Sequence, residues 1–174
     1  MCRVATLRYK YSNFSAYKLH VKRKKFITMK GIMSFFFPYK DYTYRESMLL
    51  LWLRVIFGVL FMVHGIVKMK YFSEIVGTFP NPLGLGSEFT LYCIIFVEVA
   101  CSVLIVCGAL FRIALIPSIF SMLIAFFVVH SGEGFAAKEL ALIYLVMFLI
   151  LFRMGAGSYS LDNVIARRMY VAEL

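Results

Sequence analysis

Three ionisable side chains, Arg54, His64 and Lys68, lie inside residues 47–70, an apolar stretch long enough to cross a lipid bilayer. A bilayer core needs about 20 apolar residues of helix, and a charged side chain at its centre costs about 2.5–3.5 kcal/mol. These side chains should therefore face protein rather than lipid. At about 100° of rotation per residue, one sector about 80° wide holds Arg54, Gly58, Phe61, Gly65 and Lys68, with His64 at its edge. This face is predicted to lie inside a helix bundle.

Glu98 lies near the middle of a second apolar segment, residues 88–110, which should run antiparallel to the first. Arg54 lies about four residues, roughly 6 Å, from the middle of its own helix, a gap that an arginine side chain can cover. We therefore predict an ion pair between Arg54 and Glu98. Two interpretations remain open: the pair only fixes the helix register, or Glu98 belongs to a ligand site or proton relay, as ionisable residues within membranes often do.

A second group of polar residues is expected at the outer ends of the spans: His64, Lys68, His130, Glu133, Lys138 and Glu139. Histidine exchanges protons near neutral pH because its ordinary pKa is about 6.5, and the carbonyls of a quinone accept hydrogen bonds. The group therefore predicts a site for the polar head of a quinone-like molecule. In the alternative interpretation these are ordinary polar span ends, and Lys68 and Lys138 only extend to the membrane surface.

Other chemistries have weaker support. No two histidines share one helix at a metal-ligand spacing, so we predict no metal site. Cys93, Cys101 and Cys107 form no CxxC pair and are expected to be small packing residues. No nucleotide-binding glycine loop is present.

The composition places the chain in a membrane. Of its 174 residues 62% are hydrophobic and 16% charged, and its mean hydropathy is +0.84, which is typical of an all-α integral membrane protein. We predict a bundle of four transmembrane helices; the last one, residues 140–152, reaches bilayer length only if residues 135–139 extend it. The spans are residues 47–67, 88–110, 113–130 and 140–152. Between the first two, residues 71–87 contain Pro80 and Pro82 and are expected to form an ordered or re-entrant loop that covers the outer end.

The net charge of +10 is concentrated at the N-terminus. Residues 1–30 hold nine lysines and arginines and no acidic residue, whereas the remaining residues carry ten basic and nine acidic groups. Such a tail favours a location next to the membrane over nucleic-acid binding. Together with four basic residues further along the chain, it predicts that both termini are cytoplasmic. These residues are Arg112, Arg153, Arg167 and Arg168. Residues 1–46 are expected to be a disordered or interfacial segment, 47–155 the membrane domain and 156–174 a short cytoplasmic tail. Translation from Met1, Met29 or Met33 is equally compatible with this plan.

Over residues 48–163 the chain resembles the DoxX family of small four-span bacterial membrane proteins. The resemblance rests on Arg54, Gly58, His64-Gly65, Lys68, Glu98, Gly108, Arg112, His130, Lys138-Glu139 and the GxGxYSLD ending at Asp162. It implies a multi-pass protein of the bacterial inner membrane, associated with respiratory or redox complexes. Some relatives are subunits of thiosulfate:quinone oxidoreductases.

Three functions are compatible with this resemblance. The first is a subunit or module of a quinone-linked redox system. The second is a non-catalytic membrane scaffold that recruits a redox or detoxifying protein partner. The third and weaker is a small-solute transporter, which would need a homo-oligomer to supply the inverted repeat that four spans lack.

Overall fold

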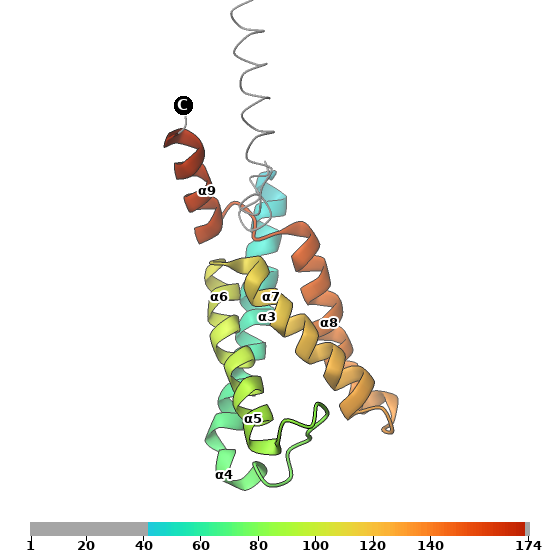
Figure 1. Cartoon of the computed structure of the whole chain (residues 1–174). Helices are drawn as coiled ribbons and strands as arrows, with labels where there is room; N and C mark the ends of the chain where they lie inside the picture. Colours follow the sequence, from blue (N-terminus) through green and yellow to red (C-terminus); the bar gives the residue numbers. More distant parts are fainter. Residues whose placement is uncertain (1–41, 173–174) are drawn as a thin grey trace, which may run out of the picture. The chain divides into compact units, whose positions relative to one another are not determined.

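The computed structural model describes residues 42–172, so our expectations for residues 1–41 lie outside the described residues. The described part is all-helical (Figure 1). Its α-helices are α3 Tyr44–Lys70, α4 Phe72–Ile75, α5 Ser87–Phe96, α6 Ser102–Cys107, α7 Phe111–Ile124, α8 Phe135–Met154 and α9 Leu161–Ala172. Two π-helical segments, η1 Val97–Cys101 and η2 Ala125–Val129, continue α5 into α6 and extend α7.

Among residues 42–172, four helical stretches are long and apolar enough to cross a membrane, which confirms the predicted all-α four-span architecture. They are Tyr44–Lys70, Ser87–Cys107, Phe111–Val129 and Phe135–Met154. The fourth span does include residues 135–139, as its short apolar core required. The first begins before Ser47 because Thr43 and Glu46 cap it reciprocally: the Glu46 amide donates to Thr43 Oγ1 at 3.4 Å and the Thr43 amide donates to Glu46 Oε2 at 2.9 Å.

The second and third spans are joined by a short turn at Gly108. Gly108 adopts a left-handed conformation with φ 66° and ends α6, and its amide donates to the carbonyl of Ile105 at 3.2 Å. A glycine ends a helix in this conformation at no steric cost because it lacks a Cβ. The turn makes the two spans antiparallel neighbours.

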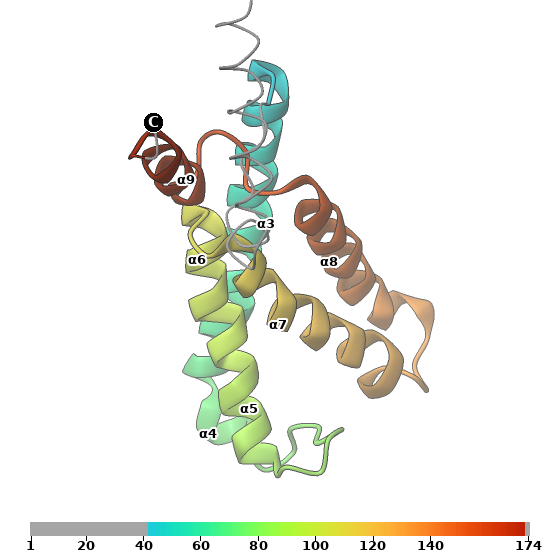
Figure 2. The same cartoon turned by 45° about the horizontal axis from the view of Figure 1, so that its top comes forward.

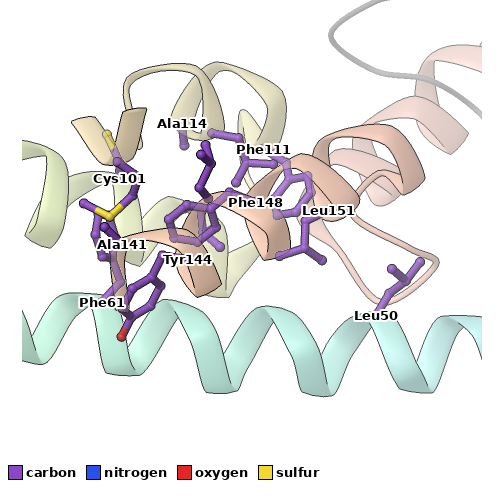
Figure 3. Packing of buried hydrophobic residues seen from close by; sticks show 13 residues of the cluster. Leu50, Phe61, Cys101, Phe111, Ala114, Ala141, Tyr144, Phe148 and Leu151 are labelled. Carbon is purple, nitrogen blue, oxygen red and sulfur yellow. The ribbon is translucent and has the colours of Figure 1, made fainter. Parts of the chain in front are cut away.

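The buried face of α3 is the one that the sequence predicts. Its buried residues are Ser47, Leu50, Arg54, Gly58, Phe61 and Gly65. This face packs along α5, η1 and α6, while α7 packs against α8 (Figure 2). Phe61, Tyr144 and Phe148 stack in the core between α3 and α8, with ring centroids 5.0–5.8 Å apart (Figure 3).

The connections alternate between two ends of the bundle. The start of α3, the turn at Gly108, the end of α8 and the start of α9 share one end, which we call the inner end (Figure 1). The segment 71–86 and the η2–α8 connection share the other, which we call the outer end. The exposed Arg153, in the last turn of α8, and Arg167, on α9, lie at the inner end. That this end is cytoplasmic stays a prediction from the positive-inside rule.

Candidate functional site

A cavity of about 340 Å³ lies toward the outer end, between all four spans and the loop that follows α4. Its polar lining is His64, Lys68, Thr90, Glu98, Ser121, His130 and Tyr144. Its apolar walls are Phe61, Phe79, Pro80, Pro82, Ile94, Met122, Ile124, Ala125, Val129, Ala137, Leu140 and Ala141. The residues of the loop, Phe79, Pro80 and Pro82, cover the cavity at the outer end, where the sequence predicts a covering loop.

Lys68 and Glu98 form an ion pair in this pocket. Lys68 Nζ donates to both carboxylate oxygens, at 2.7 Å to Oε1 and 2.6 Å to Oε2. The Glu98 side chain is 4% exposed and that of Lys68 27%. The pair therefore joins an acid buried in the second span to a cation that reaches it from near the outer end of the first.

The predicted pair between Arg54 and Glu98 does not form. Arg54 lies at the inner end, where its guanidinium Nη1 and Nη2 donate to the carbonyls of Ala156 at 2.5 Å and Tyr159 at 2.6 Å. The cause is the register of the two antiparallel spans: Arg54 lies against Gly108, whereas Glu98 lies against Gly65. Gly65 is eleven residues beyond Arg54, or about 16 Å along the helix. The prediction assumes that the middles of the two spans are level, which would leave Arg54 only about 6 Å from Glu98 along the helix axis.

Two backbone features place Glu98 in the pocket. Gly65 lets α3 approach the second span so closely that a Cβ on it would lie 2.8 Å from Glu98 Cβ and 2.7 Å from Val99 Cγ2. Glu98 also lies in the π-helical η1, where Ser102 Oγ donates to the Glu98 carbonyl at 2.6 Å. Single π-helical turns inside α-helices occur often at functional sites. The sequence pattern gives no signal for this turn, because residues 88–110 are apolar on nearly every side.

Tyr144 is a pocket residue that the sequence reasoning missed. Its ring is buried, perpendicular to the His64 ring, with the centroids 5.9 Å apart, and its hydroxyl points toward α3 (Figure 3). Within residues 42–172, neither the Tyr144 hydroxyl nor the His64 ring makes a hydrogen bond, so both can serve a ligand. The available signal was that Tyr144 carries the sole hydroxyl among the side chains of residues 135–154.

The predicted outer group is only partly brought together. His64, Lys68 and His130 line the pocket. The His130 ring Nδ1 lies 2.8 Å from Glu133 Oε2 at the entrance to the η2–α8 connection. Lys138 Nζ donates to the Ser131 carbonyl at 2.9 Å, so it closes that connection. Glu139 is exposed and does not line the pocket.

Across residues 42–172 no three histidine, cysteine or acidic side chains lie close enough together to hold a metal ion. What the pocket offers is one neutralised ion pair and several hydrogen-bonding groups within apolar walls. Such an arrangement suits an uncharged ligand with polar atoms at one end.

The inner end carries a separate set of polar contacts around Asp162. Its carboxylate accepts hydrogen bonds from the amides of Leu110 at 2.8 Å and Phe111 at 2.9 Å, so it caps the start of α7, and its own amide donates to the Gly108 carbonyl at 2.9 Å. Burial raises the pKa of Asp162 above its ordinary value of 3.8, and these amides and Arg54 act in the opposite direction. These contacts fix the last helix to the bundle.

The fold and the pocket together define a multi-pass helical membrane protein with a ligand-sized cavity toward one end of the bundle. The DoxX family model matches residues 49–131, and this match confirms the resemblance seen in the motifs over that part of the chain. The match runs from α3 through η2 and includes Lys68, Glu98 and His130, whereas Tyr144 lies beyond it.

One similar relative is an uncharacterized protein of Haemophilus influenzae. It is 29% identical over 126 residues, which cover 68% of this chain and 83% of the relative. No solved structure matches the chain.

Proposed function

We propose that this DoxX-type membrane protein binds the headgroup of a quinone in the outer-end pocket, as a module of a membrane redox system. The observation that carries the proposal is the pocket itself: hydrogen-bonding side chains and a neutralised Lys68–Glu98 pair in the lining of a largely apolar cavity. An uncharged ring with two carbonyls matches both parts of that lining.

The pocket side chains carry hydrogen-bond donors that a quinone headgroup can use. A quinone carbonyl accepts hydrogen bonds, and Tyr144, His64 and Lys68 carry O–H or N–H groups on the pocket lining. Phe61, Phe79 and Pro80 offer flat apolar surfaces for the ring. When a quinone is reduced it takes up protons, and His64 and Glu98 are side chains that exchange them.

The size of the cavity limits how much of the molecule it holds. A volume of about 340 Å³ lies at the lower end of the range for small-molecule sites. It accommodates a substituted ring and the first part of a tail. A long isoprenoid tail would extend from the pocket into the bilayer.

The pocket favours ligand binding over the alternative of a non-catalytic scaffold. A scaffold needs surfaces for its partner but no internal cavity, and interior space without a ligand leaves side chains without packing contacts. Copurification in mild detergent followed by mass spectrometry addresses both functions, because it detects a bound quinone and a redox protein partner in one sample.

The direct test is calorimetric titration of the full chain in nanodiscs with decylubiquinone, and with decylbenzene as the analogue without carbonyls. We expect saturable binding of decylubiquinone and no saturable binding of decylbenzene. Tyr144→Phe should weaken it by about two- to tenfold, the value of one hydrogen bond. Tyr92→Phe, at an exposed tyrosine outside the pocket, is the matched control and should bind normally. Equal binding of decylbenzene, or unchanged affinity in Tyr144→Phe, would contradict the proposal.

A further inference from the structure

The last helix, α9, has two contrasting faces. Asp162, Asn163 and Ala166 are buried against the bundle, at 5%, 9% and 5% exposure. On the opposite side, within a sector of about 100°, Leu161, Val164 and Ile165 are 50%, 46% and 43% exposed. Three large aliphatic side chains so placed would be costly to leave in water, since removing apolar surface from water is favourable.

The position of α9 along the spans is fixed by hydrogen bonds. Arg54 lies ten residues after the start of α3, about 15 Å along its axis, and it holds the carbonyls of Ala156 and Tyr159 immediately before α9. The Asp162 amide bonds to Gly108, the residue that ends α6. The start of α9 therefore lies level with the ends of membrane spans and within the length of α3, rather than beyond it in water.

The charge of the free surface completes the pattern. Arg167 and Arg168 are exposed, whereas the acidic Asp162 is buried at the start of α7. Arg168 lies three residues after Ile165 and four after Val164, so it shares the apolar side of the helix with them. Its aliphatic stem can lie along that side while its guanidinium reaches outward. Over residues 161–168, for which side chains are described, the free surface is apolar and basic with no acidic group.

We propose that α9 is an interfacial helix whose apolar face lies in the acyl-chain boundary of the membrane and whose arginines bind anionic phospholipid headgroups. An exposed aliphatic face, with Arg167 at its edge and the stem of Arg168 lying along it, has the features of a helix that lies in the membrane surface. Basic side chains near an anionic surface contribute about 1 kcal/mol each. The occupant of this face is the lipid of the same membrane that the four spans cross.

The depth of α9 is tested with an introduced tryptophan in the full chain in nanodiscs. Val164→Trp is made in a Trp52→Phe background, which removes the native tryptophan. Lipids brominated near the headgroup end of their acyl chains should quench this fluorescence, and aqueous iodide should not. Strong quenching by iodide with none by the brominated lipid would place the face in water and overturn the proposal.

The headgroup preference is tested by hydrogen exchange of residues 161–172. We expect slower exchange in nanodiscs that contain phosphatidylglycerol than in phosphatidylcholine alone, and Arg167→Gln/Arg168→Gln should raise the exchanging population by about fivefold per arginine. Arg45→Gln/Arg153→Gln removes the same charge near the inner end but not from α9 and should keep the lipid dependence. Identical exchange in both lipids, or equal loss in the two double variants, would contradict binding of anionic lipid by α9.

Discussion

The Lys68 ammonium lies within 2.7 Å of both carboxylate oxygens of Glu98, yet the two side chains differ in their access to water, at 27% and 4% exposure. The geometry is bidentate and joins the first span to the middle of the second. One partner is buried and the other reaches toward the outer end. Removing Lys68 and removing Glu98 should therefore lower the free energy of unfolding by different amounts.

Lys68→Met should destabilise the protein more than Glu98→Gln. The first change leaves a buried carboxylate without its cation, at about 3 kcal/mol, whereas the second keeps an acceptor for a lysine that can reach water and costs about 1 kcal/mol. Thermal unfolding in detergent measures both, and the double variant should lose less than the sum of the two by about 1–3 kcal/mol. Additive losses would show that the pair is not coupled.

Arg54→Met should destabilise the inner end independently of Glu98. Arg54 is 1% exposed and donates to two backbone carbonyls, and an unsatisfied buried acceptor costs about 1–3 kcal/mol. Arg45→Gln, at an exposed arginine of the same helix, should be nearly neutral. The double variant Arg54→Met/Glu98→Gln should show the sum of its parts, and a clear coupling energy would restore the ion pair that the sequence alone suggested.

Gly65→Ala should separate α3 from η1 and displace Glu98. The added Cβ would lie 3.2 Å from the Glu98 carbonyl carbon as well as close to two side-chain atoms, and overpacking of this kind costs about 1–3 kcal/mol. Gly132→Ala is the matched control, since nothing lies within 4 Å of its Cβ position. Unfolding in detergent compares the two, and equal stability of both variants would mean that the close approach of the helices is not required.

Asp162 predicts a pH dependence at the inner end. Burial raises its pKa above 3.8, so the folded protein keeps this proton at pH values where the unfolded chain has released it. The contribution of this carboxyl to the free energy of unfolding should therefore fall as the pH rises above 3.8. Asp162→Asn does not titrate, and the stability of the native protein relative to this variant should decline over that range. A rise instead would show that the two amides and Arg54 dominate over burial.

The four spans could be predicted because length and apolar composition set them locally. The buried face of α3 followed from helical periodicity, and its small and charged residues are those that the structure buries. The loop across the outer end followed from Pro80 and Pro82, which interrupt helices. None of these predictions needs to know where one helix lies along another.

The partner of Glu98 could not be predicted for that reason. Pairing across antiparallel helices depends on their register, and here the register is set by the close approach at Gly58 and Gly65 and by the turn at Gly108. The π-helical turn at Glu98 could not be predicted either, because the periodicity argument assumes a uniform α-helix. Tyr144 was missed because an aromatic residue on an apolar helix is typical of the core, and the contacts of Tyr144 with Phe61 and Phe148 show that it serves there as well.

The neutrality of the Lys68–Glu98 pair has an electrical consequence. Moving one elementary charge through a membrane potential of about 100 mV takes about 2.3 kcal/mol, but a cation and an anion held within 2.7 Å cancel as seen by that field. When an uncharged molecule enters or leaves the pocket beside the intact pair, no net charge moves through the membrane field. Occupancy of the pocket would then follow the amount of ligand dissolved in the bilayer, at any voltage the membrane sustains.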